Sequence, residues 1–160
     1  MQYRNLGNSN LKVSTLCLGT MMFGDQTDKK EATAIVADAY ANGINYIDTA
    51  DVYTKGASET MVGEILTGQR QDWVLATKLG NPMSDRVNLG HYSRSWMMQE
   101  IDASLKRLKT DYTDILYMHR DYNGMDLEEP LRALDAMLQA GKIRYWGVSN
   151  FRGWRIADMV

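Results

Sequence analysis

The stretch Asn45–Tyr53, NYIDTADVY, is a short apolar run that ends in polar, reactive side chains. Tyr46 and Ile47 suit a buried strand, and Asp48 follows them where the strand gives way to a loop. Four further runs have the same design, in which apolar residues precede a polar residue at the carboxyl end. They are LCLGT from Leu16, WVLATK from Trp73, TDILYMH from Thr113 and IRYWGVSN from Ile143. The sequence therefore predicts five strands, each with a reactive side chain at its carboxyl end.

The segments between these runs predict helices. The runs begin 29, 28, 40 and 30 residues apart, and a strand–helix–strand unit occupies about 30 residues or slightly more. Each segment is amphipathic and opens with a side chain that can cap a helix. The predicted starts are Asp28 with Glu31, Ser58, Ser93 and Asp126 with Glu129, the predicted stops are Gly43, Gly68 and Gly141, and a fifth helix follows Asn150.

Alternating strands and helices form a parallel sheet, which is either open and doubly wound or closed as a barrel. A doubly wound sheet that binds a dinucleotide prefers G-x-G-x-x-G after its first strand, but Gly19–Gly24 reads GTMMFG. A P-loop is also excluded, because Asp25 and Gln26 follow where Lys and Ser or Thr are needed. The polar run ends favour a barrel, because active sites of (β/α)₈ TIM barrels lie at that rim.

The chain holds only part of such a barrel, since a complete one has about 250 residues. A β-hairpin is predicted before the first unit, because YRNL and LKVS flank the turn GNSN. We therefore predict one domain over residues 1–160, an α/β fold that is an incomplete (β/α)₈ TIM barrel with an N-terminal β-hairpin and five β/α units. Because such a piece leaves strand edges unpaired, we expect it to self-associate.

The composition excludes several classes of protein. Apolar residues make up 44% and charged residues 24%, and the formal net charge is −2, so no basic surface for nucleic acid is expected. No run approaches the 18 or so apolar residues of a membrane helix, so no membrane partner is expected. A single cysteine, Cys17, favours a reducing, cytoplasmic location. One cysteine and two histidines also predict no metal site.

Four polar side chains at the predicted rim suit one reaction. Tyr53 follows Asp48 by five residues, and Lys78 and His119 end the third and fourth runs. A tyrosine hydroxyl is a poor proton donor by itself, but a neighbouring ammonium stabilises the phenolate, and a carboxylate keeps that ammonium charged and oriented. A histidine N–H can hold the carbonyl oxygen of a substrate. The set is suited to protonating a developing alkoxide.

Two further acidic residues lie close to this set in the sequence. We interpret Asp51 as a loop residue that hydrogen-bonds its own backbone. Glu59 is expected to support the start of the second helix, where a carboxylate interacts favourably with the positive end of the helix dipole. Neither is predicted to be catalytic.

Five stretches, in the same order along the chain, resemble the aldo-keto reductase family: LGTMMFG, NYIDTADVYTKGASETMVGEIL, LATKLG, SLKRLKTDYTDILYMHRD and AGKIRYWGVSNF. The resemblance implies that Asp48, Tyr53, Lys78 and His119 form the family's catalytic tetrad. In that tetrad Tyr53 would be the general acid, Lys78 and Asp48 would tune it, and His119 would orient the carbonyl. The implied activity is that of an oxidoreductase, the reversible NADPH-dependent reduction of a small-molecule aldehyde or ketone to an alcohol.

The resemblance also implies which residues hold the cofactor. Thr20, Met21, Asp48, Ser149 and Asn150 would line the nicotinamide end of NADPH/NADP+. Ser149 and Asn150 are suited to hydrogen bonds with a carboxamide. Gln26 matches a cofactor contact found in some branches of the family.

A second hypothesis belongs to another functional class. The chain is then a non-catalytic barrel fragment, or a regulatory or structural member of the family that keeps the motif. After His119 the chain has Arg120 and Asp121, and not the Trp-Pro of the aldose-reductase branch. This resembles the bacterial and potassium-channel-beta-like branches.

Overall fold

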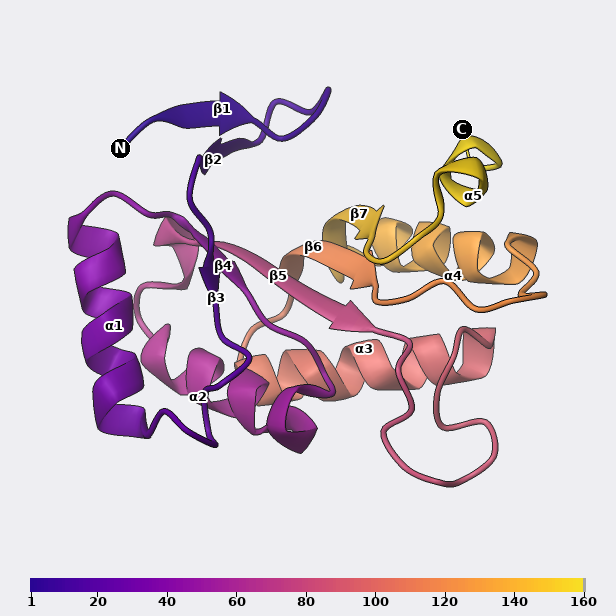
Figure 1. Cartoon of the computed structure of the whole chain (residues 1–160), viewed down its shortest axis with the longest axis horizontal. Helices are drawn as coiled ribbons and strands as arrows, with labels where there is room; N and C mark the ends of the chain where they lie inside the picture. The colour runs from indigo at the N-terminus through magenta and orange to yellow at the C-terminus, as the bar shows by residue number, and fades with distance from the viewer. Residues whose placement is uncertain (160) are drawn as a thin grey trace.

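Five parallel strands form one sheet in the computed structural model, which describes residues 1–159. The strands lie side by side in the same order as in the sequence, without the reversal that a doubly wound sheet has at its switch point (Figure 1). This order confirms the predicted incomplete (β/α)₈ barrel. The strands are β3 (Leu18–Gly19), β4 (Tyr46–Asp48), β5 (Val74–Leu79), β6 (Thr113–Met118) and β7 (Ile143–Val148).

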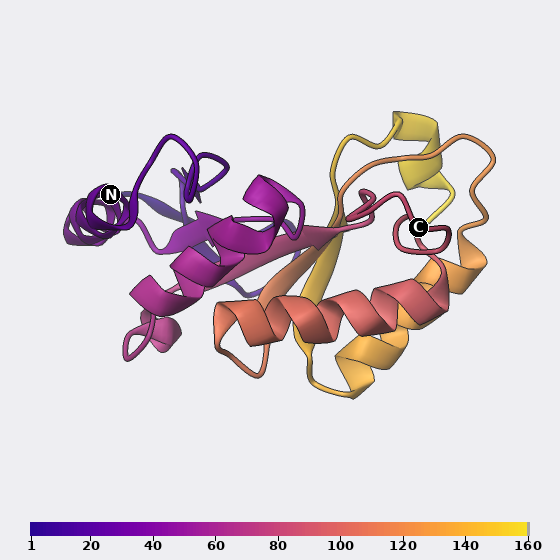
Figure 2. The ribbon, with the colours of Figure 1, turned by 90° about the horizontal axis from the view of Figure 1, so that it is seen from below.

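Helices cover the outer face of this sheet, and α2 and α3 lie in front of the strands in Figure 2. Predicted caps are confirmed at two helix starts, where Asp28 and Ser93 each accept a backbone N–H three residues further on. Before the helix Glu128–Gln139 the cap position is Leu127 and not Asp126, although the Asp126 carboxylate still accepts the N–H of Glu129. The helices are α1 (Lys29–Ala41), α2 (Ala57–Ile65), α3 (Arg94–Leu108), α4 (Glu128–Gln139) and α5 (Gly153–Ala157), with short 3₁₀ turns η1 (Tyr53–Gly56) and η2 (Arg70–Asp72). No helix among residues 1–159 is long and apolar enough to cross a membrane.

The start of the second helix differs from the prediction. Helix α2 begins at Ala57, and Ser58 is a buried residue in its first turn. The Ser58 hydroxyl donates to the Thr20 carbonyl at 2.8 Å and lies 2.9 Å from the Thr49 hydroxyl, so it is not a helix cap. Its bonds join α2 to the loops that follow β3 and β4.

The predicted N-terminal hairpin closes one end of the sheet's inner face. Strands β1 (Tyr3–Asn5) and β2 (Lys12–Ser14) pair antiparallel and lie apart from the main sheet in Figure 1. Val13 of the hairpin packs against Val74, Ala76 and Ile115, which belong to β5 and β6. The amino-terminal end of the inner face is therefore packed mainly with apolar side chains.

Strand β5 is the most deeply buried strand, with all six of its residues buried. Leu75 and Leu79 face the helices, while Val74 and Ala76 pack under the hairpin. Parallel strands are usually covered on both faces in this way. A lysine at position 78 of this strand is therefore largely shielded from water.

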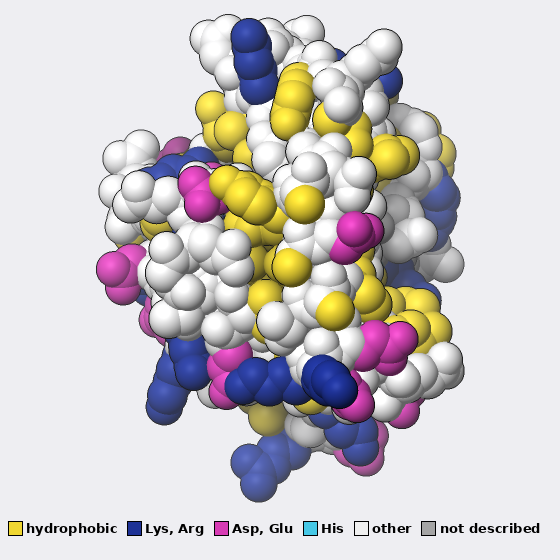
Figure 3. All heavy atoms as spheres, turned by 90° about the vertical axis from the view of Figure 1, so that its left-hand side faces the viewer, with side chains coloured by type: hydrophobic (Ala, Val, Ile, Leu, Met, Phe, Trp, Pro, Cys, Tyr) yellow, Lys and Arg dark blue, Asp and Glu magenta, His cyan; other side chains and the backbone are white. Residues whose placement is uncertain are grey.

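The two outer strands have one neighbour each. Among residues 1–159, β3 pairs only with β4 and β7 pairs only with β6. Leu16, just before β3, and Tyr145 of β7 are both exposed. Figure 3 views the end of the molecule where α1 lies and shows apolar side chains gathered in the middle of that face.

Produced by itself, the polypeptide of residues 1–160 is expected to self-associate, because both edges present unpaired backbone N–H and C=O groups. Size-exclusion chromatography with light scattering should detect species heavier than the 18.2 kDa monomer. The variant Tyr145→Lys should associate less, since a charged side chain on an edge strand opposes pairing. A monodisperse wild-type monomer would contradict this expectation.

Candidate active site

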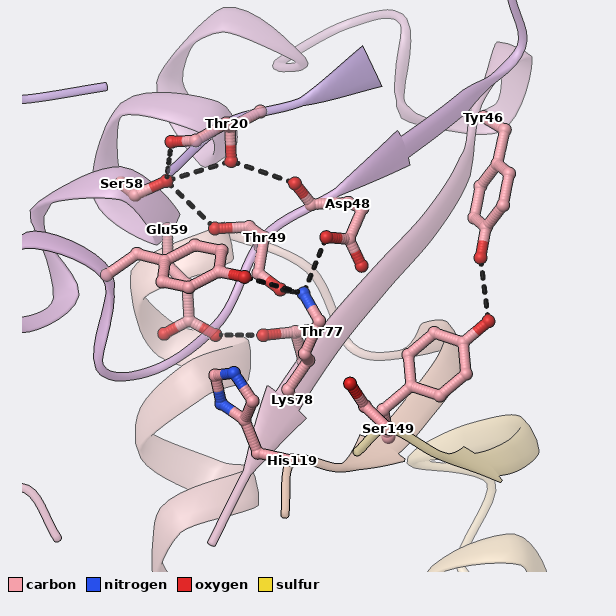
Figure 4. A network of polar contacts seen from close by, with 12 residues as sticks. Thr20, Tyr46, Asp48, Thr49, Ser58, Glu59, Thr77, Lys78, His119 and Ser149 are labelled. Atoms are coloured by element: carbon pink, nitrogen blue, oxygen red, sulfur yellow. Dashed lines mark hydrogen bonds and ion pairs between the residues drawn. The ribbon is translucent and has the colours of Figure 1, made fainter. Parts of the chain in front are cut away.

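The ammonium group of Lys78 is the centre of the candidate site. Its Nζ donates to Oδ2 of Asp48 at 2.5 Å, to the Thr49 carbonyl at 2.8 Å and to the Tyr53 hydroxyl at 3.1 Å (Figure 4). An ammonium has three N–H donors, so all three are used. The Tyr53 oxygen accepts one of them, which leaves its own proton free for a different partner. Three of the predicted site residues are thus in direct contact.

Strand register explains how these residues meet. In the β4–β5 pair Asp48 lies opposite Ala76, and Lys78 is two residues further along β5, on the same face as Ala76. The loop after β4 follows β5, since Asp51 N–H donates to the Lys78 carbonyl at 3.0 Å. Turn η1 then brings Tyr53 back over the lysine.

Burial and charge act in opposite directions on Asp48. Burial raises the pKa of Asp48, and the Lys78 ammonium opposes that shift. A buried ion pair gains little net stability, because desolvation of both ions offsets their attraction. The main effect of the Asp48 carboxylate is therefore to orient the Lys78 ammonium.

His119 completes the group from the end of β6. Its ring meets the Tyr53 ring edge-on, with centroids 5.8 Å apart and an interplanar angle of 80°. Burial, and then the charges of Lys78 and Arg120, lower the pKa of His119 to about 4. Its Nδ1 is buried and has no hydrogen-bond partner within residues 1–159. The imidazole is therefore neutral near pH 7.

Ser149 and Asn150 follow β7 beside His119. The Asn150 Nδ2 donates to the Ser149 hydroxyl and to the His119 carbonyl, both at 3.0 Å. Ser149 is partly exposed and Asn150 is exposed. Their polar groups thus face an open rim next to the histidine, which suits recognition of an amide group.

The residues after β3 divide into a buried and an exposed part. Thr20 is completely buried, and its hydroxyl donates to the Asp48 carbonyl at 3.0 Å. Its side chain supports the backbone of the site. Met21 is exposed, and so is Gln26. A cavity of about 350 Å³ lies here, bounded by the residues Leu18–Phe23, Thr27, Ile35, Asp48 and Tyr53.

The Asp51 side chain bonds to the local backbone of its loop, as expected, because Oδ1 accepts the N–H of the next residue, Val52, at 2.6 Å. The residue is nevertheless fully buried, and Oδ2 has no partner within residues 1–159. Burial, and then the charges of Glu59 and Glu100, raise the pKa of Asp51 to about 8. The carboxyl group is therefore largely protonated at neutral pH.

Two sets of polar contacts in and around the site were not predicted. The hydroxyls of Tyr46 and Tyr117 lie 2.8 Å apart on the inner face, and burial raises the pKa of both. Glu59 is in the first turn of α2, as expected, but it is fully buried and bonds to Thr77 and Arg107. Strand alternation could have found the tyrosine pair, because Tyr46 shares a face with Asp48. No group of three or more potential metal-ligating side chains occurs in residues 1–159.

Comparisons with known proteins show the family to which the chain belongs. Residues 15–160 match the model of the Aldo/keto reductase family. The chain is 38% identical over 154 residues to YqkF, an uncharacterized oxidoreductase of Bacillus subtilis, covering 95% of this chain and 50% of that protein. It is 40% identical over 164 residues to a probable voltage-gated potassium channel subunit beta of Arabidopsis thaliana, covering 99% and 49%.

A solved structure gives the same result. The holo form of an aldo-keto reductase from Bacillus halodurans superposes with a TM-score of 0.90 at 38% identity, covering 99% of this chain and 53% of that one. The chain therefore spans about half the length of the curated relatives it matches. Since the family model covers nearly all of its residues, the chain belongs to the aldo/keto reductase family.

Proposed function

We propose that this chain supplies the catalytic groups of an oxidoreductase that reduces small aldehydes or ketones with NADPH, and that runs in reverse as an alcohol oxidation. The observation that carries the proposal is the ammonium of Lys78, which contacts both Asp48 and the Tyr53 hydroxyl. Buried lysines are costly, and this one has one of its three donors aimed at a phenol. That arrangement is of use where a phenol gives up a proton.

Tyr53 is the general acid in this proposal. As charge develops on the substrate oxygen, the phenol proton moves to it and negative charge moves to the Tyr53 oxygen. Lys78 already donates to that oxygen, so the stabilising charge is in place before the reaction begins. Asp48 keeps the ammonium charged and pointed at the phenol.

His119 orients the substrate carbonyl. Because the imidazole is neutral near pH 7, one of its ring nitrogens carries a proton and the other does not. The protonated nitrogen donates to the carbonyl oxygen beside the Tyr53 ring. A neutral donor here adds no positive charge next to Lys78.

The residues at the rim fit a nicotinamide cofactor in part. Ser149 and Asn150 offer unburied hydrogen-bonding groups for a carboxamide, and Met21 offers an exposed apolar side chain beside the cavity at Tyr53. Thr20 contributes through its backbone position, because its hydroxyl is already engaged. When bound, NADPH would supply the hydride. The solved relative from Bacillus halodurans is a holo form, which supports a bound cofactor in the family.

A regulatory role is the second candidate. It is favoured by the similarity to probable voltage-gated potassium channel beta subunits. In that case the protein binds the nucleotide and turns over aldehydes slowly or not at all. Steady-state reduction of 4-nitrobenzaldehyde, measured beside NADPH binding in the full-length protein, separates the two candidates.

The variant Tyr53→Phe should lose carbonyl reduction and keep NADPH binding. The ring alone preserves the packing, but the proton donor is gone, and general acids contribute on the order of 10²–10⁴-fold. Steady-state kinetics with 4-nitrobenzaldehyde measure the loss, with Tyr40→Phe, an exposed tyrosine, as the matched control. A loss of less than about tenfold would contradict the assignment.

The variant Lys78→Met should lower kcat on the order of 10²-fold or more, because nothing then stabilises the phenolate that the proton leaves behind. Asp48 also loses its charged partner. The exposed Lys106→Met is the control, since it removes the same charge at the surface. Equal activity of the two variants would remove Lys78 from the mechanism.

His119 should make the fold sensitive to acid. Below pH 6.5 the unfolded chain takes up a proton at this residue, while the folded state resists it until about pH 4. Stability should therefore fall with falling pH in this window, by up to about 1.4 kcal/mol per pH unit from this group. Urea unfolding at several pH values should give a steeper dependence for wild type than for His119→Asn, and identical slopes would contradict the expectation.

A further inference from the structure

We infer that Glu59 is a positioning residue, whose carboxylate ties the segment that carries Tyr53 to the strand that carries Lys78. The inference rests on the proposed function, because it concerns the contact between those two residues. Glu59 itself touches none of the four rim residues through a hydrogen bond. It acts through Thr77 on one side and through the turn η1 on the other.

The bond to Thr77 locates the strand. Oε1 of Glu59 accepts the Thr77 hydroxyl at 2.5 Å, and the carboxylate is completely buried (Figure 4). Thr77 directly precedes Lys78, and successive side chains of a strand point to opposite faces. Thr77 therefore faces α2 while Lys78 faces the mouth. Because Thr77 is held from the helix side, the backbone position from which the Lys78 side chain extends is held as well.

The turn between Tyr53 and Glu59 needs to be held. Thr54, Lys55 and Gly56 have φ values of 49°, 53° and 88°, three consecutive residues in the left-handed region. Residues other than glycine rarely adopt this conformation, and it persists only where the surroundings impose it. Upstream, the turn is held by the Asp51 N–H bond to the Lys78 carbonyl. Downstream, the first buried side chain that hydrogen-bonds to β5 is Glu59, through Thr77.

Arg107 of α3 completes the anchor. Its Nε donates to Oε2 of Glu59 at 2.6 Å, so both carboxylate oxygens are occupied. The same side chain covers the turn, because a Cβ added at Gly56 would lie 2.9 Å from Arg107 Cδ. Arg107 also pairs with Glu100, which is nearly as buried as Glu59.

Glu100 is therefore a natural control. It shares the arginine and the burial of Glu59, but it has no hydrogen bond to β5 or to η1. If Glu59 only stabilised the fold, the two glutamates would behave alike. If Glu59 positions the site, only its removal changes the chemical step.

The experiment uses Thr77→Val, Thr77→Ser, Glu59→Gln and Glu100→Gln in the full-length protein with NADPH. Thr77→Val keeps the shape and removes the donor, whereas Thr77→Ser keeps the hydroxyl. We expect Thr77→Val and Glu59→Gln to lower kcat by about 10–100-fold, since small misplacements of catalytic groups have effects of this size. KM for the aldehyde and the Kd for NADPH should stay within about twofold. Thr77→Ser and Glu100→Gln should keep the wild-type kcat.

A second readout does not depend on activity. Hydrogen–deuterium exchange of the amides of residues 53–58 should speed up in Thr77→Val and Glu59→Gln, and stay unchanged in Glu100→Gln. If the wild-type protein reduces no aldehyde, the proposed function fails, and exchange still decides whether Glu59 holds the turn.

Two results would overturn the inference. One is a wild-type kcat in Thr77→Val, which is the milder variant and decides the matter if Glu59→Gln does not fold. The other is an equal loss of kcat in Glu59→Gln and Glu100→Gln, which would mean that both act only on stability.

Discussion

A buried ammonium loses the water that would solvate it, so each of its N–H groups has to find an acceptor in the protein. Lys78 meets this constraint with the Asp48 carboxylate, the Thr49 carbonyl and the Tyr53 hydroxyl. Two of these acceptors come from the end of β4 and its loop, and the third from η1. The register of β4 on β5 and the path of the following loop are therefore part of the same electrostatic requirement.

That requirement extends outward through the structure. Tyr53 is followed directly by a turn of three left-handed residues in succession. Such a turn costs free energy, of the order of 1–3 kcal/mol for each non-glycine residue, which the surrounding contacts have to offset. Ser58 and Glu59, both buried on the first turn of α2, provide contacts on the far side of that turn. Buried polar side chains on the helix side of the sheet are thus linked to the Lys78–Tyr53 contact on its inner face.

The sequence predicted those features that follow from local pattern. Apolar runs that end in Asp48, Lys78 and His119 predicted both the strands and the rim, because parallel strands present their carboxyl ends at one edge. The pattern did not predict what Ser58 and Glu59 do. A capping motif and a helix dipole explain a serine or a glutamate at a helix start, whereas the observed roles depend on Thr20, Thr49 and Thr77, which other elements bring near. Pairings of buried polar groups across elements are set by tertiary structure and carry no local periodicity.

The order of strands in the sheet has a consequence for how the chain folds. Each strand pairs with the strand that precedes it in the sequence, so each β/α unit can dock on the one already formed as synthesis proceeds. Contacts between sequence neighbours cost little loop-closure entropy, which favours rapid assembly of this half of a parallel sheet. The hairpin is the exception. The apolar cluster around Val13 includes Ile115, so it is complete only after about a hundred further residues have been synthesised. Of the groups in the candidate site, the Lys78 cluster can assemble once the third barrel strand has docked, whereas His119 arrives one unit later.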